Sequence, residues 1–403
     1  MTVAALSPPP PRRVLFVSPV GEKGGAEQVL VDIVRGLDRM RFTPLVVCLK
    51  PGPLVDELRA LGVYAVGLRP HQTRQIHRVA GAICSLARIM RTERVEALHA
   101  NGGTMLFYAA LGARLAGAKI PIVWSVYDPL HGGGAFERAF VTAQRRLRPA
   151  WTIFGTPAVA PTYEQSYARL VAGRSQTTLP GVSIADLEAG ADAARARRDW
   201  GVPPDAPIAV MFARLQPSKG HADLIEAAAR VLAARPDVYF LLCGGALFGL
   251  HPGYEDELRA MIAARDLEKR VRLTGYVSDA QKKDLLAAAT LIVHPARSEP
   301  FGIALIEGMA AGKPVVATDC DGPRSIVVPG ETGLLVSPGD PAALAAAISA
   351  LLADPQRARF LGASGRTRAY QQYSVEAMVT QVEQVYDAVL HNTLNKRQNG
   401  YVH

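Results

Sequence analysis

The sequence is poor in features that mark several common classes of protein. Only four of its 403 residues are cysteines, and their separations match no metal-binding or redox motif. Isolated cysteines are typical of reduced thiols in a cytosolic protein. No apolar run approaches the roughly 20 residues of a membrane-spanning helix. Hydrophobic residues at 49% and charged residues at 20% are instead typical of a soluble globular chain. The cysteines are Cys48, Cys84, Cys243 and Cys320.

Three sequence motifs of enzymes are also missing. Neither GxGxxG nor GxxxxGK[ST] occurs, which excludes the usual dinucleotide and Walker phosphate loops. The run of three glycines after His131 is similar to the oxyanion loop of lipases, but no GxSxG nucleophile follows or precedes it. We therefore interpret the His131 loop as a substrate-facing loop and not as part of a hydrolase.

Positive charge is concentrated in the first half of the chain. The net charge is +9, and residues 1–180 contain 22 Lys and Arg against 11 Asp and Glu. Such a basic region can meet an anionic membrane surface, an acidic acceptor or nucleic acid. No aromatic platform or nucleic-acid-binding motif accompanies the charge, so we expect no nucleic-acid partner.

The length and the order of predicted elements indicate two domains. A chain of 403 residues exceeds the size of a single hydrophobic core. Short apolar strands alternate with amphipathic helices, which predicts two tandem Rossmann-like domains of the α/β class facing across a cleft. We expect residues 1–12 to form a disordered leader within a first domain of 1–181. The second domain covers 182–372, and a C-terminal helix follows in 373–403.

One βα turn in the second domain has the character of a ligand site. A strand at Leu291–Val293, a polar loop at His294–Pro300 and a helix at Ile303–Ala311 follow one another. Glu299 lies before the helix and Glu307 inside it. Backbone N–H groups at the start of a helix can hold a phosphate, and flanking carboxylates can accept sugar hydroxyls. The N–H groups concerned are those of Phe301, Gly302 and Ile303.

Other candidate residues also lie where predicted strands end. Arg214 and Lys219 flank a βα loop, and two cations there would neutralise a diphosphate. Gly24 and Gly25 would let the first βα loop approach a ligand, although an ordinary tight turn explains them equally well. His99 ends another strand and is either a site residue or a hydrogen-bonded structural histidine. The Asp-Cys-Asp run at 319–321 has no further carboxylate cluster beside it, so we assign no metal.

These motifs together resemble those of the GT-B glycosyltransferases of family 4, the retaining "group 1" enzymes. The resemblance extends from about residue 13 to 390, and the EPFGxxxxE segment at 299–307 is its most specific part. The other matching motifs are Gly24-Gly25, Arg214 with Lys219, Gly275-Tyr276-Val277 and the segment Gly330–Val336.

The resemblance implies a role for each matching residue. Arg214 and Lys219 would bind the donor diphosphate as the leaving group, and Glu299 would accept hydroxyls of the transferred sugar. The ribose would be bound by Glu307. The remaining donor contacts would come from Gly24, Gly25, Gly275, Tyr276, Val277, Phe301, Gly302 and Ile303.

The resemblance further implies a retaining transfer of a hexosyl group from a UDP- or GDP-sugar to a hydroxyl, without a metal or another cofactor. The acceptor would be a glycan, a lipid-linked molecule or a small molecule, as in cell-surface polysaccharide or glycolipid synthesis. The location would be cytoplasmic, with docking at the inner face of the membrane as an option.

The sequence departs from the family at one position. Relatives commonly carry a histidine at the end of the strand where this chain has Tyr127, and a phenol is a poor base at neutral pH. His99 or His131 would be the alternative, or the departing phosphate would take the proton of the acceptor. Rival activities are a phosphorylase, an epimerase or a non-catalytic nucleotide-sugar sensor.

Overall fold

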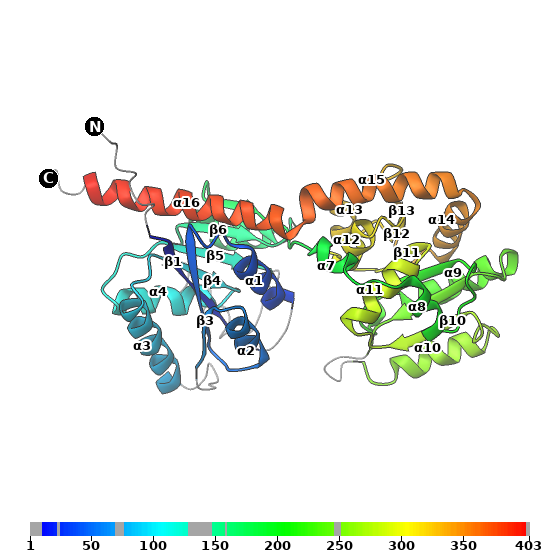
Figure 1. Ribbon diagram of the computed structural model, residues 1–403, viewed down its shortest axis with the longest axis horizontal. Coiled ribbons are helices and arrows are strands. Elements are labelled where there is room, and N and C mark those ends of the chain that lie inside the picture. The colour runs from blue at the N-terminus through cyan, green and yellow to red at the C-terminus, as the bar shows by residue number, and fades with distance from the viewer. Residues whose placement is uncertain are drawn as a thin grey trace. The chain divides into compact units, whose positions relative to one another are not determined.

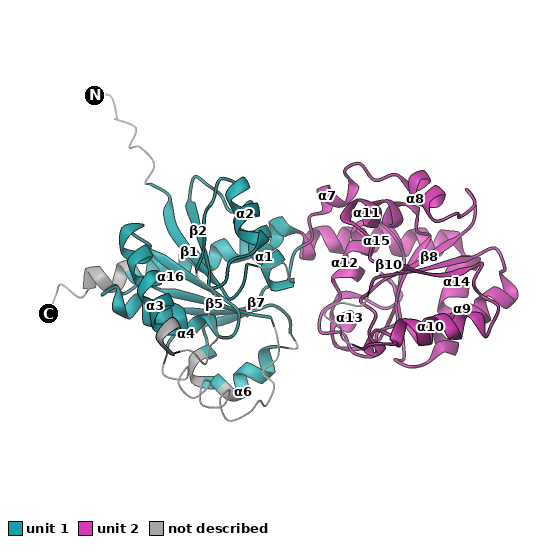
Figure 2. Ribbon diagram, turned by 90° about the horizontal axis from the view of Figure 1, so that it is seen from below, with its two compact units in different colours: residues 1–181, 375–403 teal, residues 182–374 magenta. Residues whose placement is uncertain are grey.

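The computed structural model describes residues 10–21, 25–68, 76–127, 147–157, 159–245 and 251–399. The chain divides into two compact units, residues 1–181 with 375–403 and residues 182–374 (Figure 2). Each unit contains a parallel β-sheet with helices between successive strands (Figure 1). The predicted α/β class with two Rossmann-like domains is therefore confirmed. Most of the predicted leader lies outside the described residues, but Arg12 already belongs to the first strand.

The first unit is built on a seven-stranded sheet in the order β3-β2-β1-β4-β5-β6-β7. Its strands are β1 (Arg12–Ser18), β2 (Phe42–Cys48), β3 (Tyr64–Gly67), β4 (Ala97–Asn101), β5 (Ile122–Val126), β6 (Trp151–Phe154) and β7 (Ser175–Thr177). Its helices are α1 (Gly25–Gly36), α2 (Pro53–Ala60), α3 (Ile76–Thr92), α4 (Met105–Leu115), α6 (Ala160–Val171) and α16 (Val375–Asn399).

Both faces of this sheet are covered, which explains why its central strands are apolar at consecutive positions. Every residue of β4 and β5 is buried. One face packs against α3 and α4, and the other against α1, α2 and α16. Helix α16 lies far away in the sequence but packs on α1 and β5 (Figure 1). Its Val379, Val382 and Tyr386 complete the hydrophobic core.

The second unit is built on a six-stranded sheet in the order β10-β9-β8-β11-β12-β13. Its strands are β8 (Ile208–Phe212), β9 (Tyr239–Cys243), β10 (Val271–Gly275), β11 (Leu291–His294), β12 (Val315–Thr318) and β13 (Leu334–Val336). Its helices are α7 (Ile184–Glu188), α8 (Ala193–Asp199), α9 (His221–Ala234), α10 (Tyr254–Ala263), α11 (Asp279–Ala288), α12 (Ile303–Ala310), α13 (Asp321–Ile326), α14 (Pro341–Ala353) and α15 (Pro355–Tyr373).

Two neighbouring strands of this sheet position the candidate site. Strands β8 and β11 run parallel and side by side, so their carboxyl ends open onto the same edge. The segments that leave this edge are Ala213–Gly220 and Pro295–Gly302. None of the described helices is both long and apolar enough to cross a lipid bilayer.

Candidate functional site

The loop between β11 and α12 ends in an uncapped helix N-terminus. Gly302 has φ 107°, a left-handed conformation that glycine adopts without a steric penalty. Among the described residues, no side chain caps Gly302 at the start of α12, and no partner is observed for the N–H groups of Ile303 and Ala304, which remain available to a ligand. Phe301 is buried below the turn, whereas Ile303 is 40% exposed. Of the three predicted backbone donors, Gly302 and Ile303 have N–H groups with no observed partner in the described residues, whereas the N–H of Phe301 already bonds to Glu299.

Glu299 is the centre of a partly buried charge cluster. Its Oε2 accepts hydrogen bonds from Lys219 Nζ at 2.8 Å and from His294 Nε2 at 3.2 Å. Its Oε1 accepts one from the backbone N–H of Phe301 at 3.3 Å. Burial alone would raise the pKa of Glu299, but His294 and Lys219 outweigh it and lower the pKa to about 2. Glu299 is therefore ionised at any physiological pH.

Lys219 is held in place by the loop that carries it. It ends a short 3₁₀ helix, Pro217–Lys219, and Gly220 follows with φ 77°. A Cβ atom at Gly220 would stand 2.0 Å from the carbonyl oxygen of Pro295, so the two loops pack with no room for a side chain. The Lys219 and Glu299 side chains are only 12% and 14% exposed. A rigid, largely dehydrated ion pair results.

Arg297 ties the same two loops together from the other side. Its guanidinium donates two hydrogen bonds to Asp223 on α9, at 2.9 and 2.7 Å. Its backbone N–H donates to the carbonyl of Ser218 at 2.8 Å. Because these contacts fix both loops, the positions of Lys219 and Glu299 do not depend on their own ion pair alone.

Arg214 is the other predicted cation in the segment that carries Lys219. It follows β8 by two residues and is exposed. Within the residues that the structure describes, no hydrogen bond or ion pair of its side chain is observed. A guanidinium in this state can turn toward an incoming anion without breaking an existing pair.

Glu307 lies inside α12 and is 8% exposed. Its Oε1 accepts a hydrogen bond from Lys282 Nζ on α11 at 2.5 Å. The predicted donor contacts at Gly275–Val277 begin at the end of β10, where Gly275 pairs with Gly244 across an isolated bridge. Tyr276 beside it is 75% exposed, so its ring has a free face for stacking.

The prediction that His99 is an acceptor-side residue is wrong. His99 is fully buried in β4, and its Nδ1 and Nε2 bond to Tyr386 Oη at 2.6 Å and Ser125 Oγ at 2.7 Å. Burial lowers the pKa of His99 to about 3, so the ring is neutral. It is the hydrogen-bonded structural histidine that the sequence left as the alternative.

The other predictions for the first unit have mixed outcomes. Tyr127 directly follows β5 and is partly buried; burial raises its pKa well above the ordinary value, although a hydrogen bond with Ser125 opposes this. The phenolate form of Tyr127 is therefore even less populated at neutral pH than the sequence suggests, so the side chain is not available as a base. Gly25 is the first residue of α1. Gly24 and His131 lie outside the described residues.

Sequence reasoning missed two hydrogen-bond partners of the carboxylates in the second unit. His294 was assigned to the loop, but it is the last residue of β11, 3% exposed and bonded to Glu299. The sequence signal was its place directly after an apolar strand. Lys282 had no signal of its own, because only the packing of α11 against α12 brings it to Glu307. In the Asp-Cys-Asp run, Asp319 pairs with Arg324 at 2.7 Å.

Two protein-family models match the chain. The model of the family "Glycosyl transferases group 1" matches residues 192–368, and that of "Glycosyltransferase Family 4" matches residues 23–167. The chain is 36% identical over 199 residues to alpha-maltose-1-phosphate synthase of Mycobacterium tuberculosis, a match that covers 47% of this chain and 50% of that protein. The chain thus spans only half the length of that relative.

Two further similarities extend over nearly the whole chain. A D-inositol 3-phosphate glycosyltransferase of Thermobispora bispora is 27% identical over 408 residues, covering 92% of this chain and 91% of that one. The crystal structure of Anabaena HepE in complex with UDP and glucose superposes with a TM-score of 0.78 at 26% identity, covering 94% of this chain and 100% of that one.

Proposed function

The chain belongs to the group 1 glycosyltransferases and has their GT-B fold, and from this premise we propose that it transfers a hexosyl group from a nucleoside diphosphate sugar to a hydroxyl, with retention at the anomeric carbon. UDP- and GDP-sugars are the proposed donors. The solved HepE complexes, which contain UDP and UDP-glucose, support a nucleotide sugar. Synthesis of a polysaccharide or glycolipid is the proposed context, with work at the inner face of the membrane as one possible location.

The ionised Glu299 beside the free end of α12 is the observation that carries the proposal. A carboxylate with a pKa near 2 that accepts hydrogen bonds from Lys219, His294 and one backbone N–H still has lone pairs for hydroxyl donors. The uncapped helix N-terminus next to it presents N–H groups to an anion. A hydroxyl-accepting carboxylate and a phosphate-binding helix end, held at one sheet edge, suit a sugar joined to a phosphate.

The proposed chemistry breaks the bond between the anomeric carbon and the diphosphate oxygen, whose electron pair leaves with the diphosphate. Arg214, Lys219 and the α12 dipole stabilise the negative charge that develops there. These charges do what a divalent cation does in other transferases, so we propose that no metal is needed. The new bond forms between the acceptor oxygen and the same face of the anomeric carbon.

The acceptor's proton then needs a base. His99 is buried with both ring nitrogens bonded, and Tyr127 has a raised pKa, so neither suits the task. In the proposed reaction the proton passes to the departing diphosphate. There it offsets the negative charge that the diphosphate has just gained. The acceptor itself is a hydroxyl of a glycan, a lipid-linked molecule or a small molecule.

A thermal-unfolding screen tests the donor assignment. UDP-, GDP- and ADP-sugars are added to the purified chain, and the shift in Tm is measured for each. We expect one nucleotide series to stabilise the wild type and to stabilise Arg214→Gln much less. Lys269, an exposed lysine in the same unit, provides the matched control Lys269→Gln, which should respond like the wild type. Failure of every nucleotide sugar to shift the Tm would contradict the proposal.

A further inference from the structure

A second charged cavity lies at the opposite edge of the second unit's sheet. Pro207, Thr290 and Pro314, each directly before β8, β11 or β12, line a cavity of about 460 Å³. These strands have four or five residues and rise about 3.3 Å per residue. The cavity is therefore roughly 13–17 Å from the edge that carries Glu299. It is separate from the proposed donor site.

Positive charge dominates the lining of this cavity. Four cations line it, and Asp205 is the single acidic residue among the lining residues. Of the four, only Arg235 has a carboxylate partner in the described part of the chain, Asp237 at 2.9 Å. The cations are Arg197, Arg235, Lys313 and Arg359.

The remaining three cations are not neutralised by an observed ion pair. Arg197 donates to the carbonyl oxygens of Pro203 and Ala206, at 2.7 and 2.8 Å. Lys313 donates to the carbonyl oxygen of Ala287 at 2.8 Å. Arg359 is exposed, and no side-chain partner for it is seen among the described residues. Carbonyl oxygens satisfy hydrogen bonds but leave the net charge in place.

The pKa of Lys313 reflects the positive charge that surrounds it. Burial lowers its pKa, and the nearby positive charge of Arg197 lowers it further. Two cations that repel each other in a partly dehydrated cavity are stabilised by any anion that binds between them.

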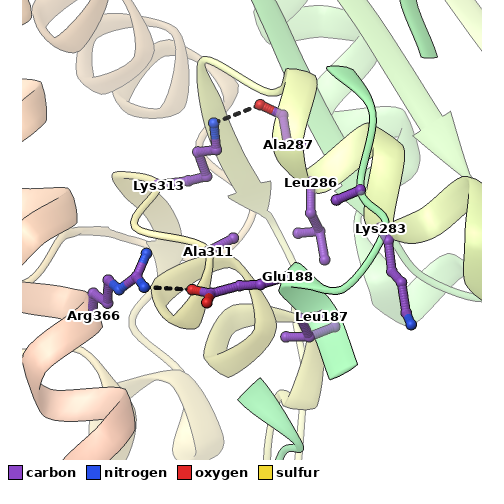
Figure 3. Close-up of a pocket in the computed structure, with 9 residues that line it drawn as sticks. Leu187, Glu188, Lys283, Leu286, Ala287, Ala311, Lys313 and Arg366 are labelled. Atoms are coloured by element: carbon purple, nitrogen blue, oxygen red, sulfur yellow. Dashed lines mark hydrogen bonds and ion pairs between the residues drawn. The ribbon is translucent and has the colours of Figure 1, made fainter. Parts of the chain in front are cut away.

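A neighbouring cavity has a smaller excess of positive charge, because three cations and one carboxylate line it instead of four cations and one carboxylate. It shares Lys313 and is also lined by Glu188, Lys283 and Arg366. There Glu188 pairs with Arg366, and the Lys283 ammonium points away from the others (Figure 3). The carboxylate of that cavity is thus paired with one of its lining cations. In the cavity in front of β8, β11 and β12, no ion pair between Asp205 and a lining cation is observed in the described part of the chain.

The other wall of the charged cavity is apolar. Leu351 and Leu352 from α14 and Pro355 and Ala358 from α15 line it. A ligand there would place an anionic group against the cations and a carbon skeleton against this wall. A bare inorganic ion would leave most of the volume unfilled.

We propose that this cavity binds a small phosphomonoester, with the phosphate near Lys313, Arg197 and Arg359. A phosphomonoester carries about −1.5 to −2 charges at pH 7, which matches the three cations left without a carboxylate. The site goes beyond the proposed transfer reaction and requires no part of it.

Isothermal titration with glucose 6-phosphate tests the proposal, in the presence of saturating UDP so that the donor site is occupied. We expect one binding event per chain, at least tenfold weaker in Lys313→Gln and several-fold weaker in Arg359→Gln. Arg359→Gln alters an exposed side chain, so it keeps the test valid if Lys313→Gln unfolds. Glucose without the phosphate should not bind.

Arg357→Gln is the matched control, because Arg357 is exposed on the same helix but does not line the cavity. Equal weakening in Arg357→Gln and Arg359→Gln would mean diffuse attraction to a basic helix and would overturn the site. Loss of binding in Arg214→Gln would place the ligand in the donor site and overturn it as well.

A phosphomonoester can also be a lipid headgroup. Sedimentation with phosphatidylcholine vesicles, with and without phosphatidic acid, separates the two sources. Binding to phosphatidic acid that Arg359→Gln weakens and Arg357→Gln leaves intact would assign the site to a lipid, even if glucose 6-phosphate does not bind. Binding to neither probe would reject the proposal.

Discussion

Two histidines occupy equivalent strands of the two sheets, yet their surroundings differ completely. β4 lies next to β1 in the first unit as β11 lies next to β8 in the second, and His99 and His294 are on these strands. His99 bonds to two neutral hydroxyls and is sealed in the core. His294 bonds to a carboxylate that also binds a lysine. A histidine thus belongs to a fully satisfied hydrogen-bond network in the first unit. In the second unit it supports a carboxylate that can still accept hydrogen bonds.

Unused hydrogen-bonding capacity separates the polar residues that can bind a ligand from those that only support the core. Around His99 the hydrogen-bonding groups satisfy one another inside the core of the first unit. In the second unit Glu299 retains acceptor capacity, and Arg214 and the α12 N-terminus retain donor capacity. Mutation of His99 should therefore lower the stability of the fold, whereas mutation of the charged residues around Glu299 should lower the activity.

The largest effect is expected from Lys219→Ala. It removes the cation that is proposed to stabilise the leaving diphosphate, and we expect this to cost about 2–4 kcal/mol in the transition state, or roughly 10²–10³-fold in kcat. Steady-state transfer assays measure this, with Lys269→Ala as the matched lysine control. Unchanged turnover in Lys219→Ala would show that the cluster around Glu299 does not act in the transfer reaction.

Arg214→Gln should reduce the rate by about 10²-fold through loss of one charge-assisted contact. Because Arg214 has no observed partner in the described residues, the free energy of unfolding should stay the same. Transfer assays and urea unfolding of the same preparation check both halves. A stability loss as large as the activity loss would show that Arg214 is structural.

His99→Phe should have the opposite effect. The change leaves the hydroxyls of Tyr386 and Ser125 without their buried partner, at a cost of about 1–3 kcal/mol each. Urea unfolding should report a lower free energy of unfolding, while the folded fraction keeps its kcat. A large fall in kcat without loss of stability would return His99 to the site.

His99 also makes stability depend on pH. Its folded pKa of about 3 lies below the value near 6.5 of an unfolded histidine, so the unfolded chain binds the extra proton between those limits. Its contribution is complete above pH 6.5 and declines, by at most about 1.4 kcal/mol per pH unit, as the pH falls toward 3. In His99→Phe that part of the slope should disappear.

A smaller effect is expected from His294→Gln, which weakens the support of the Glu299 carboxylate. The pKa of Glu299 should rise from about 2 toward its usual value. Activity near pH 7 should change little, but the acidic limb of the pH–rate profile should move to higher pH. An acidic limb at the wild-type position would show that His294 does not tune Glu299.

The smallest effect is expected from metal removal. Arg214, Lys219 and the helix dipole supply the charge stabilisation in the proposed reaction, so EDTA should leave the initial rate unchanged. The assay compares EDTA-treated enzyme with the same enzyme after Mg²⁺ is restored. Strong inhibition that Mg²⁺ reverses would contradict this prediction and make Asp319 and Asp321 candidate metal ligands.

Local signals in the sequence were enough to locate the βα turn of the site. Gly302 and Gly312 punctuate it, and the predicted helix Ile303–Ala311 differs from α12 by one residue. Helix α10 was missed, although Tyr254, Leu258 and Ile262 repeat every four residues. Its apolar side chains are few and charged residues separate them, so the helical period was easy to overlook.

Contacts between distant segments were beyond sequence reasoning. His99 and Tyr386 are separated by 287 positions, and nothing near His99 in the chain predicts that α16 will bury it. Likewise, the pairing of Lys282 with Glu307 depends on how α11 packs beside α12. The type of chemistry could be predicted from local motifs, whereas the state of each polar side chain depended on tertiary packing.

A crystal structure of the chain with UDP is the most direct test of the central claim. We predict that the diphosphate contacts the guanidinium of Arg214 and the ammonium of Lys219, with an oxygen facing the N-terminus of α12 and the ribose near Glu307. A nucleotide bound elsewhere, or a diphosphate that contacts neither cation, would contradict the account.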